Sequence, residues 1–346
     1  MSTPVTIAVD CMGGDHGVAP VVDGALEALE EGAERQLCVM LIGDRSQIQE
    51  VLEYRDVPSG AALSIEHADD VIAMDESPTE VLRRPRSSIA VGLKKHKEGA
   101  VQGFISPGNT GAVMAAALRN MQRLPGVMRP AIASLFPNPR SVTVVLDVGA
   151  NTECKPHNLL QWAVMGSVFS QLVLKHQNPR VGLLSIGEER TKGTDTVQAA
   201  HDLLHRSEAI HFVGNVEGRD ILSGEYDVVV TDGYVGNILL KFAESVGPLL
   251  EAKLRHQVDT NVFSRVGAFL MQPFLRRVRQ SLDYAEHGGA PMLGVDGVIL
   301  ICHGASGVRA IKNAVFEAER SVRQGVNVHI KEHLQRVTEE EAPRVV

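Results

Sequence analysis

The stretch IAVDCMGG, residues 7–14, places an apolar run that predicts a β-strand directly before a pair of glycines. Four later segments repeat this design: FISPGNTG at 104–111, VVLDVGAN at 144–151, FVGNVEG at 212–218 and VVVTDGYVGN at 228–237. Open α/β sheets bind ligands at the carboxyl ends of their parallel strands. Glycine lets a ligand approach the backbone closely, and free N–H groups suit an anion such as phosphate. The five turns therefore predict one pocket rimmed by backbone amides.

The composition is that of an ordinary globular protein with a large core. The chain has 346 residues, of which 44% are hydrophobic, so it is long enough for one large domain or two closely associated ones. The formal net charge of −8 leaves no global basic field, and only 4% of the residues are aromatic. Both features argue against nucleic-acid binding, which needs a basic surface and often aromatic stacking platforms.

Nothing in the sequence predicts a metal centre or a membrane span. The four cysteines contain no CxxC pair, which favours reduced, buried thiols in a cytoplasmic protein. The chain enters its first strand soon after Pro4, so we expect no signal peptide. No apolar run is long enough to cross a bilayer. We therefore expect a cytoplasmic protein without a metal ion.

Strand-like and helical patterns alternate almost throughout, which predicts an α/β fold. Without a Gly/Ser linker, residues 1–330 are expected to form a single α/β catalytic domain, and the charged tail at 331–346 is expected to fray. The predicted strands lie at 5–10, 37–43, 63–67, 101–106, 130–136, 142–148, 181–186, 210–214, 227–231 and 298–302. The predicted helices lie at 18–32, 45–54, 86–98, 110–123, 156–176, 194–206, 235–256 and 306–323.

The segment 257–283 interrupts this alternation. Its apolar residues recur near helical spacing, several arginines flank them, and Pro273 should break or kink the helix. One interpretation is a helical hairpin packed on the body or at a dimer interface, and another is an interfacial helix on anionic lipid. A hairpin that protrudes from a dimer would satisfy both. The residues in question are Val262, Val266, Phe269, Leu270, Phe274 and Val278.

The turn SPGNTG at 106–111 is neither G-x-G-x-x-G nor a Walker A sequence, so support for NAD or ATP binding is weak. A glycine-rich turn before a helix suits a small anion, with the hydroxyls of Ser106 and Thr110 as additional donors. The alternative is a helix N-cap by Asn109 or Thr110. The predicted anion-binding residues of this turn are Ser106, Gly108, Asn109, Thr110 and Gly111.

The turn DCMGGDHG at 10–17 carries two carboxylates and a histidine. Asp15 and His16 are candidates to orient a ligand or tune a proton. Alternatively, Asp15 caps the next helix and His16 is exposed. A metal site here has little support, because no second carboxylate cluster shows ligand spacing.

Two further positions are candidates for stabilising a developing oxyanion. Lys192 precedes glycine at a loop–helix junction and could reach an anion, although a solvated charged loop is the alternative. Asn237 opens a helix and could donate to a carbonyl oxygen, or else cap that helix. Glycine-rich turns elsewhere add Asn151, Asn215, Asp232 and Gly233 to the predicted substrate- and phosphate-binding residues.

No pairing of nucleophile and base stands out, because G-x-S-x-G and other family-like nucleophile settings are absent. A reaction in which phosphate itself attacks an activated acyl group would need no covalent enzyme intermediate.

At these residues the chain resembles the PlsX family of bacterial phosphate acyltransferases, the acyl-[acyl carrier protein]:phosphate transacylases. The likeness runs in order to about residue 325, and Pro107 departs from it by replacing the usual alanine and removing one N–H donor. The motifs that carry it are IAVDCMGGDHG (7–17), SPGNTGA (106–112), LDVGAN (146–151), VGLLSIGEERTKG (181–193), FVGNVEGRDI (212–221), VVVTDGYVGN (228–237), GGAPMLG (288–294) and HGAS (303–306).

The resemblance implies conversion of an acyl-[acyl carrier protein] and inorganic phosphate to acyl phosphate and free carrier protein, without a cofactor. It implies a Rossmann-like αβα sandwich similar to isocitrate and isopropylmalate dehydrogenases and to phosphotransacetylase, with a protruding helical hairpin. It also implies a cytoplasmic homodimer that associates peripherally with the membrane and feeds phospholipid synthesis, with the downstream glycerol-3-phosphate acyltransferase as a candidate partner.

Within that resemblance, Lys192 and Asn237 would stabilise the oxyanion or position the phosphate, while Asp15 and His16 would orient the pocket. The basic stretch with Arg83, Arg84 and Arg86 resembles a contact for the acidic carrier protein, although a solvated helix start is the alternative. Two other functions stay open: a metal- and NAD-dependent hydroxyacid dehydrogenase of related fold, and a membrane-associated scaffold that binds acyl carrier protein without turnover.

Overall fold

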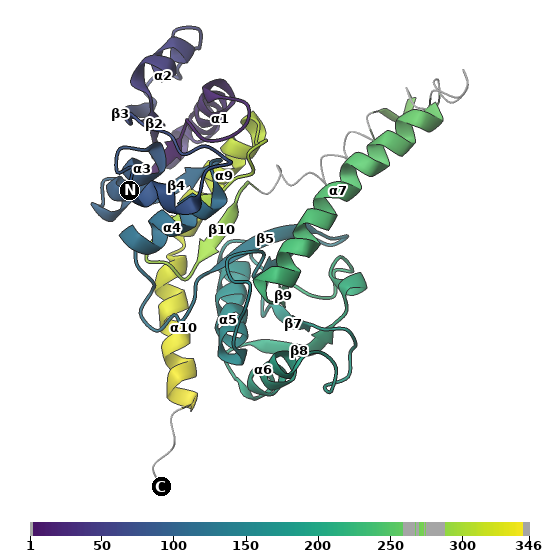
Figure 1. Cartoon of the computed structure of the whole chain (residues 1–346). Helices are drawn as coiled ribbons and strands as arrows, with labels where there is room; N and C mark the ends of the chain where they lie inside the picture. The colour runs from purple at the N-terminus through teal and green to yellow at the C-terminus, as the bar shows by residue number, and fades with distance from the viewer. Residues whose placement is uncertain (1–2, 259–266, 268–269, 273, 275–287, 342–346) are drawn as a thin grey trace.

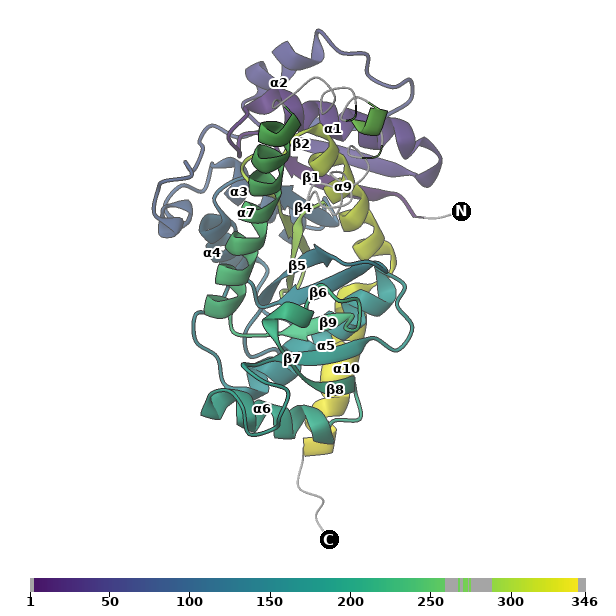
Figure 2. The same ribbon diagram turned by 90° about the vertical axis from the view of Figure 1, so that its right-hand side faces the viewer.

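A single eleven-stranded sheet runs through the protein in the order β3-β2-β1-β4-β11-β10-β5-β6-β9-β7-β8 (Figure 1). The computed structural model describes residues 3–258, 267, 270–272, 274 and 288–341. Helices cover both faces of this sheet, as Figure 2 shows from a second direction, so the α/β sandwich expected from the sequence is confirmed.

The elements follow the predicted alternation closely. The strands are β1 (Val5–Asp10), β2 (Leu37–Gly43), β3 (Ala62–His67), β4 (Gly103–Ser106), β5 (Ala131–Pro137), β6 (Val142–Leu146), β7 (Arg180–Leu184), β8 (His211–Val216), β9 (Val228–Val230), β10 (Ala290–Leu293) and β11 (Val298–Ile301). The helices are α1 (Val18–Glu31), η1 (Ala33–Arg35), α2 (Arg45–Leu52), η2 (Pro78–Leu82), α3 (Ser88–Lys97), α4 (Thr110–Asn120), α5 (Pro156–Leu172), α6 (Asp195–Arg206), η3 (Gly218–Asp220), α7 (Gly233–Val258), α9 (Val308–Arg323) and α10 (Val326–Glu341).

The sheet reverses direction at its centre. Strands β3, β2, β1, β4 and β11 are mutually parallel, and β6, β9, β7 and β8 form a second parallel set. The antiparallel strands β10 and β5 join the two sets. Because neighbouring strands rotate by about 20–25° each, the five pairings from β4 to β9 turn the second set by roughly 100° relative to the first. The carboxyl ends of the first set lead into α1, α4 and α9, and the carboxyl end of β9 in the second set leads into α7.

One face of the sheet carries a continuous apolar core. Phe104 of β4 and Val229 of β9 belong to the same cluster, together with Val113 of α4 and, at its margin, Leu240 of α7. The opposite face holds two clusters, one under α1 and α9 and one under α5, α6 and α10. Helices α4 and α7 therefore pack on the same face, each starting at the carboxyl end of a strand.

The expectation that the chain frays from residue 331 is wrong up to Glu341. This part of the chain belongs to α10, in which Ile330, Leu334 and Val337 are buried against the core that includes α5. Burial of such a side chain contributes roughly 1.5–3 kcal/mol, enough to hold a charged helix against the body. The sequence analysis also missed β10, whose four residues lie inside the GGAPMLG motif.

Helix α7 confirms the helix expected at 235–256 and extends it to Val258, carrying the chain out from the body (Figure 1). Its exposed apolar residues include Ile238, Phe242 and Leu249. In the segment 257–283, Leu270 and Phe274 are exposed, whereas Val266 and Phe269 lie outside the described residues. No helix of the described chain is both long and apolar enough to span a membrane.

Candidate functional site

Three turns from distant parts of the sequence meet at the carboxyl ends of β1, β4 and β11, which are adjacent strands. We call 10–17, 106–111 and 302–307 the first turn group. The backbone N–H of Asp15 donates to the carbonyl oxygen of Gly304 at 2.7 Å, and Cys302 donates to Ser106 at 2.9 Å. The helices α1, α4 and α9 all start in this group, with Gly17, Asn109 and Gly307 as their N-caps. Three helix N-termini at one edge form a backbone environment suited to a multiply charged anion.

The side chains of Ser106 and Asn109 are occupied within the protein. Ser106 Oγ donates to Asp10 Oδ2 at 2.6 Å and accepts from the Gly108 N–H at 3.0 Å. Asn109 Oδ1 accepts from the Ala112 N–H, which confirms the capping interpretation. Its amide donates to three carbonyl oxygens of the preceding loop, those of Ala73, Met74 and Glu76. Both residues thus shape the turn, and anion binding by their side chains stays a prediction.

Thr110, Asp15 and His16 are exposed in the first turn group, in keeping with a role toward a ligand. An exposed His16 also fits the alternative in which this side chain has no role toward a ligand. Asp15 does not act as a side-chain cap of α1, because the Gly17 cap has no side-chain hydrogen bond. The capping alternative for Asp15 is therefore wrong.

The glycine at position 13 allows two of these turns to touch. A Cβ atom there would lie 2.5 Å from the Gly108 nitrogen and 2.6 Å from its Cα. We expect Gly13→Ala to push the turns apart, to cost about 1–3 kcal/mol of stability and to raise the KM for phosphate, because overpacking moves backbone. Urea unfolding and steady-state kinetics measure both effects. Gly218→Ala, where nothing lies within 4 Å of the added Cβ, is the control, and equal behaviour of the two variants would refute close contact at Gly13.

Asp10 is a buried carboxylate of the first turn group that sequence reasoning left without a role. Besides Ser106, it accepts from the Met12 N–H at 3.0 Å. Burial raises the pKa of Asp10, although the hydrogen bonds from Ser106 and Ser88 favour its ionised form. Its position as the last residue of a strand before the glycines was the available signal. It acts as a positioning residue, because it holds the turn that follows β4.

The raised pKa of Asp10 gives a stability difference that depends on pH. The stability linked to a carboxyl of raised pKa is fully present below its unfolded pKa of about 4 and is lost as pH rises through the folded pKa. The wild type should lose this stability as pH rises from about 4, whereas Asp10→Asn has no carboxyl there to ionise. The difference in unfolding free energy, variant minus wild type, should therefore increase with pH. Urea unfolding between pH 4 and 8 measures it. A difference that stayed constant over this range would contradict the assignment.

The second turn group, 147–151 and 231–237, lies at the carboxyl ends of β6 and β9 and is organised by Asp147. This buried carboxylate accepts five hydrogen bonds, from the backbone N–H groups of Ile132, Gly149, Ala150 and Asn151 and from the Asn151 amide. Burial raises the pKa of Asp147 despite these donors. Sequence reasoning missed it because its principal role is toward backbone groups.

The predicted residues of the second turn group divide into structural and accessible ones. The Asn151 amide donates to the Pro130 carbonyl oxygen at 2.7 Å, and Asp232 Oδ1 accepts from the Val235 N–H at 2.9 Å. Gly233 donates to the Asn151 carbonyl and leaves no room for a Cβ. Asn237 is exposed beside Gly149, so its side chain is the one best placed to meet a substrate.

The loop after β7 carries Lys192 next to two buried polar atoms without partners. Lys192 is exposed, and no described group pairs with its ammonium. Asn215 donates to the Glu189 carbonyl oxygen at 2.9 Å, while Asn215 Oδ1 and Ser185 Oγ are buried and unpaired. Buried polar atoms without partners are costly, so such atoms near a loop mark a place for water or ligand. Ser185 was missed because a single serine after a strand has no distinctive spacing.

A further cation, Arg129, lies two residues before β5 and beside the second turn group. Its guanidinium donates to the Glu153 carbonyl oxygen at 3.0 Å. Burial raises the pKa of the Cys154 thiol to about 12, Asp232 and Asp147 add to this rise, and Arg129 opposes it. Arg129 is therefore within electrostatic range of this site, and Cys154 carries no thiolate at neutral pH.

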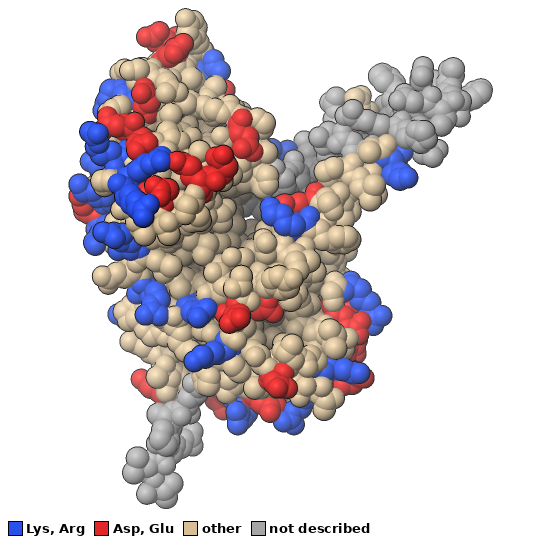
Figure 3. Space-filling view, viewed as in Figure 1, with Lys and Arg blue, Asp and Glu red and all other residues tan. Residues whose placement is uncertain are grey.

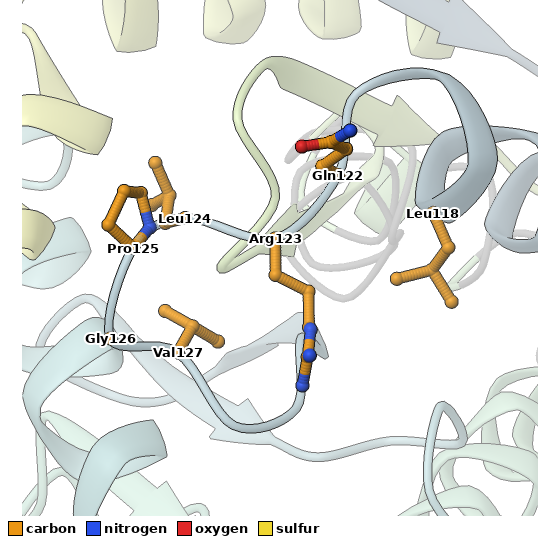
Figure 4. A pocket seen from close by; sticks show the side chains of 7 residues that line it. All are labelled: Leu118, Gln122, Arg123, Leu124, Pro125, Gly126 and Val127. Carbon is orange, nitrogen blue, oxygen red and sulfur yellow. The ribbon is translucent and has the colours of Figure 1, made fainter.

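Among the described residues, no hydrogen bond or ion pair joins the first turn group to the second. Figure 3 shows the surface hollowed between the half that carries β1–β4 and the projecting α7, which starts in the second turn group. A separate cavity of about 580 Å³ lies in the connection from α4 to β5 and contains none of the predicted site residues (Figure 4).

The arginines expected to meet a carrier protein are paired with carboxylates. Arg83 contacts Glu80 at 2.8 Å and Arg86 contacts Asp69 at 3.1 Å. Arg84 contacts Glu76 at 2.5 Å. These pairs reduce the positive field of the stretch, and carrier contact there stays a prediction. Within the described ranges, no group of three or more His, Cys, Asp or Glu residues could hold a metal ion.

Comparison with known proteins places the chain among lipid-synthesis enzymes. Residues 5–329 match a family described as fatty acid synthesis protein. A phosphate acyltransferase of Heliobacterium modesticaldum is 46% identical over 329 residues, which cover 95% of this chain and 97% of that protein. A phosphate acyltransferase of Synechocystis is 44% identical over 95% of this chain and 94% of that protein. A phosphotransacetylase from Streptococcus pyogenes has the same fold, with a TM-score of 0.61 at 15% identity over 92% of this chain and 94% of that protein.

Proposed function

The chain belongs to the fatty acid synthesis protein family, in which it is a phosphate acyltransferase, and from this premise we propose that it transfers the acyl group of an acyl-[acyl carrier protein] to inorganic phosphate. The products are an acyl phosphate and the free carrier protein. The curated relatives support the acyl transfer, and the anion-binding character of the first turn group supports phosphate as the acceptor. The convergence of the three helix N-termini is the observation on which the proposal depends.

In the proposed reaction the nucleophile is the substrate phosphate. A phosphate oxygen attacks the thioester carbonyl carbon, the carbonyl oxygen becomes a tetrahedral oxyanion, and collapse breaks the C–S bond. The carrier thiolate takes a proton, so hydrogen phosphate and acyl thioester give acyl phosphate and thiol. The first turn group holds the phosphate, while Lys192 and Asn237 donate to the oxyanion.

The cysteines take no part as nucleophiles in this scheme. Burial raises the pKa of Cys302 to about 12 and raises the pKa of Cys11 further. A thiol in that state is inert at neutral pH. Direct attack by bound phosphate needs no covalent acyl-enzyme, which agrees with this chemistry.

The test is the reaction itself with purified full-length protein, long-chain acyl-[acyl carrier protein] and inorganic phosphate. Acyl phosphate is followed by hydroxylamine trapping and mass spectrometry, and we expect product that depends on phosphate and persists with a chelator and without nucleotide. Absence of product with carrier protein still bound would favour the scaffold alternative. Chelator-sensitive reduction of NAD with a hydroxyacid would favour the dehydrogenase.

We also propose that the protein is a cytoplasmic homodimer that contacts the membrane peripherally and feeds phosphatidic acid synthesis. The exposed apolar residues along α7 and at Leu270 and Phe274 support contact with a second copy or with lipid. An acyl phosphate is a reactive, lipophilic product, so a downstream glycerol-3-phosphate acyltransferase is the expected consumer. Analytical ultracentrifugation and vesicle flotation test the two contacts separately.

A further inference from the structure

The loop between α4 and β5 lies in a long stretch of the sequence without acidic residues. No Asp or Glu occurs between Glu98 and Asp147, whereas Arg119, Arg123 and Arg129 all fall in this interval. Arg119 is exposed and forms no ion pair with a described residue, and Arg123 and Arg129 donate to backbone carbonyl oxygens. Their charges therefore remain available, in contrast to the paired arginines at 83–86.

This loop also lines an open groove whose residues are of mixed character, with polar and apolar side chains at its border. The cavity of about 580 Å³ lies between the end of α4 and the loop, and Figure 4 shows the side chains of Leu118 and Arg123 at its border. Leu118 is 41% exposed, so its side chain is accessible to a partner seated in the groove. The lining residues are Leu118, Gln122, Arg123, Leu124, Pro125, Gly126 and Val127.

Hydrogen bonds to two neighbouring elements hold the groove in shape. Gln161 of α5 accepts from the Met128 N–H at 2.8 Å and donates to the Gly126 carbonyl oxygen at 2.9 Å. The Leu124 N–H donates to Gly294 at 3.0 Å, and Arg123 donates to the Met128 carbonyl oxygen. A loop fixed in this way binds without a large ordering cost.

The chain leads from this groove directly to the second turn group. Trp162 Nε1 donates to the Arg129 carbonyl oxygen at 2.9 Å, and the next residue, Pro130, accepts from the Asn151 amide. The far end of α4 begins in the first turn group, about 16 Å away for a helix of this length. A partner seated in the groove would therefore lie beside the second turn group and within about the length of α4 from the first.

We propose that this groove is the docking surface for the acidic carrier protein that delivers the acyl thioester. The inference rests on the proposed function and identifies where its protein substrate binds. Arg119 and Arg123 face carboxylates of the carrier, and Leu118 and Pro125 contact its apolar residues. The acidic residue Asp296 contacts this loop through its backbone N–H, which donates to the Gln122 carbonyl oxygen, and forms no ion pair with either arginine in the described structure. A cationic rim of this kind raises the rate of encounter with an acidic partner.

Charge reversal of the two arginines tests the docking surface. Arg119→Glu combined with Arg123→Glu should raise the KM for acyl-[acyl carrier protein] about tenfold and reduce its dependence on salt. The KM for phosphate and kcat should stay at the wild-type values, because neither arginine contacts the reacting atoms. Arg119→Glu alone, which leaves the hydrogen bond to Met128 intact, should raise the same KM by a smaller factor. Lys331→Glu combined with Arg336→Glu makes the same charge change on the exposed side of α10 and is the control.

The outcomes separate failure of the docking surface from failure of the proposed function. If the wild-type protein turns over and the double variant has the same KM for the carrier protein, the docking surface is overturned. It is also overturned if substitutions at 83–86 raise that KM and the double variant does not. Reduced flotation with vesicles containing anionic phospholipid, without a change in carrier KM, would overturn it in favour of lipid. No acyl phosphate from the wild-type protein would overturn the proposed function itself.

Discussion

Lys192→Ala is expected to lower kcat by about 100- to 1,000-fold, the usual effect of removing one donor to a developing oxyanion. The exposed ammonium has no described partner in the resting protein, so the structure gives it no competing task. Asn215 and Ser185, at the same end of the sheet, have buried oxygen atoms without partners, which mark a place for water or a ligand. Because Lys192 holds no part of the fold together, the melting temperature should hardly change.

The control for Lys192 lies two residues away in the same loop. Arg190 forms an ion pair with Asp202 at 2.7 Å and points its charge at α6, so Arg190→Ala should keep kcat near the wild-type value. Lys192→Arg should restore part of the activity if charge is what matters. Steady-state rates of acyl phosphate formation decide the question, and a Lys192→Ala enzyme with wild-type kcat would remove the residue from the mechanism.

Asp147→Ala is expected to cost about 3–5 kcal/mol of unfolding free energy, since a buried acceptor with several partners disappears. Five N–H donors from the start of β5 and the turn after β6 would then lack an acceptor in a buried site. Activity should fall as well, because the same turn supports Gly233 and the start of α7. Urea unfolding at neutral pH measures the loss through a lower midpoint.

Asp232→Ala provides the matched comparison for Asp147. Asp232 belongs to the same turn group but accepts one hydrogen bond, from Val235, at a helix start. Its removal should cost about 1 kcal/mol, the usual value for an N-cap. If both substitutions destabilised the protein equally, the network around Asp147 would not be the organising element of this turn group.

The α/β class and the positions of the ligand-facing turns could be predicted from the sequence because both are local properties. An apolar run followed by glycine marks the end of a strand wherever that strand lies in the sheet. The roles of individual side chains could not be predicted, because their hydrogen-bond partners are distant in the sequence. Asn109 is held by carbonyls more than thirty residues earlier, and Asn151 by Pro130. A spacing pattern cannot identify such partners.

Composition was a poor guide where a few apolar positions decided the structure. The segment 331–346 was expected to fray because it is charged. However, Ile330, Leu334 and Val337 recur at helical spacing, and their side chains are buried in the core. Lys192 and Asn237 are both exposed, so nothing in the fold conflicts with their predicted roles toward a substrate. The prediction that Asn237 opens or caps its helix is wrong, because α7 already begins at Gly233. Asp10, Asp147 and Arg129 were missed because each acts mainly on backbone groups or stands alone in the sequence.

The strand order has a consequence for synthesis on the ribosome. Strands β11 and β10 come from the last sixty residues, yet they fill the space between β4 and β5 and join the two halves of the sheet. Until they emerge, a nascent chain presents two unpaired strand edges, which are sites for aggregation. At about 5–20 residues per second, the nearly two hundred residues between β4 and β10 keep the β4 edge open for some ten seconds or more. A chaperone that binds nascent chains should therefore be needed most late in translation. At that stage residues 302–307, the last segment of the first turn group, have not yet been made.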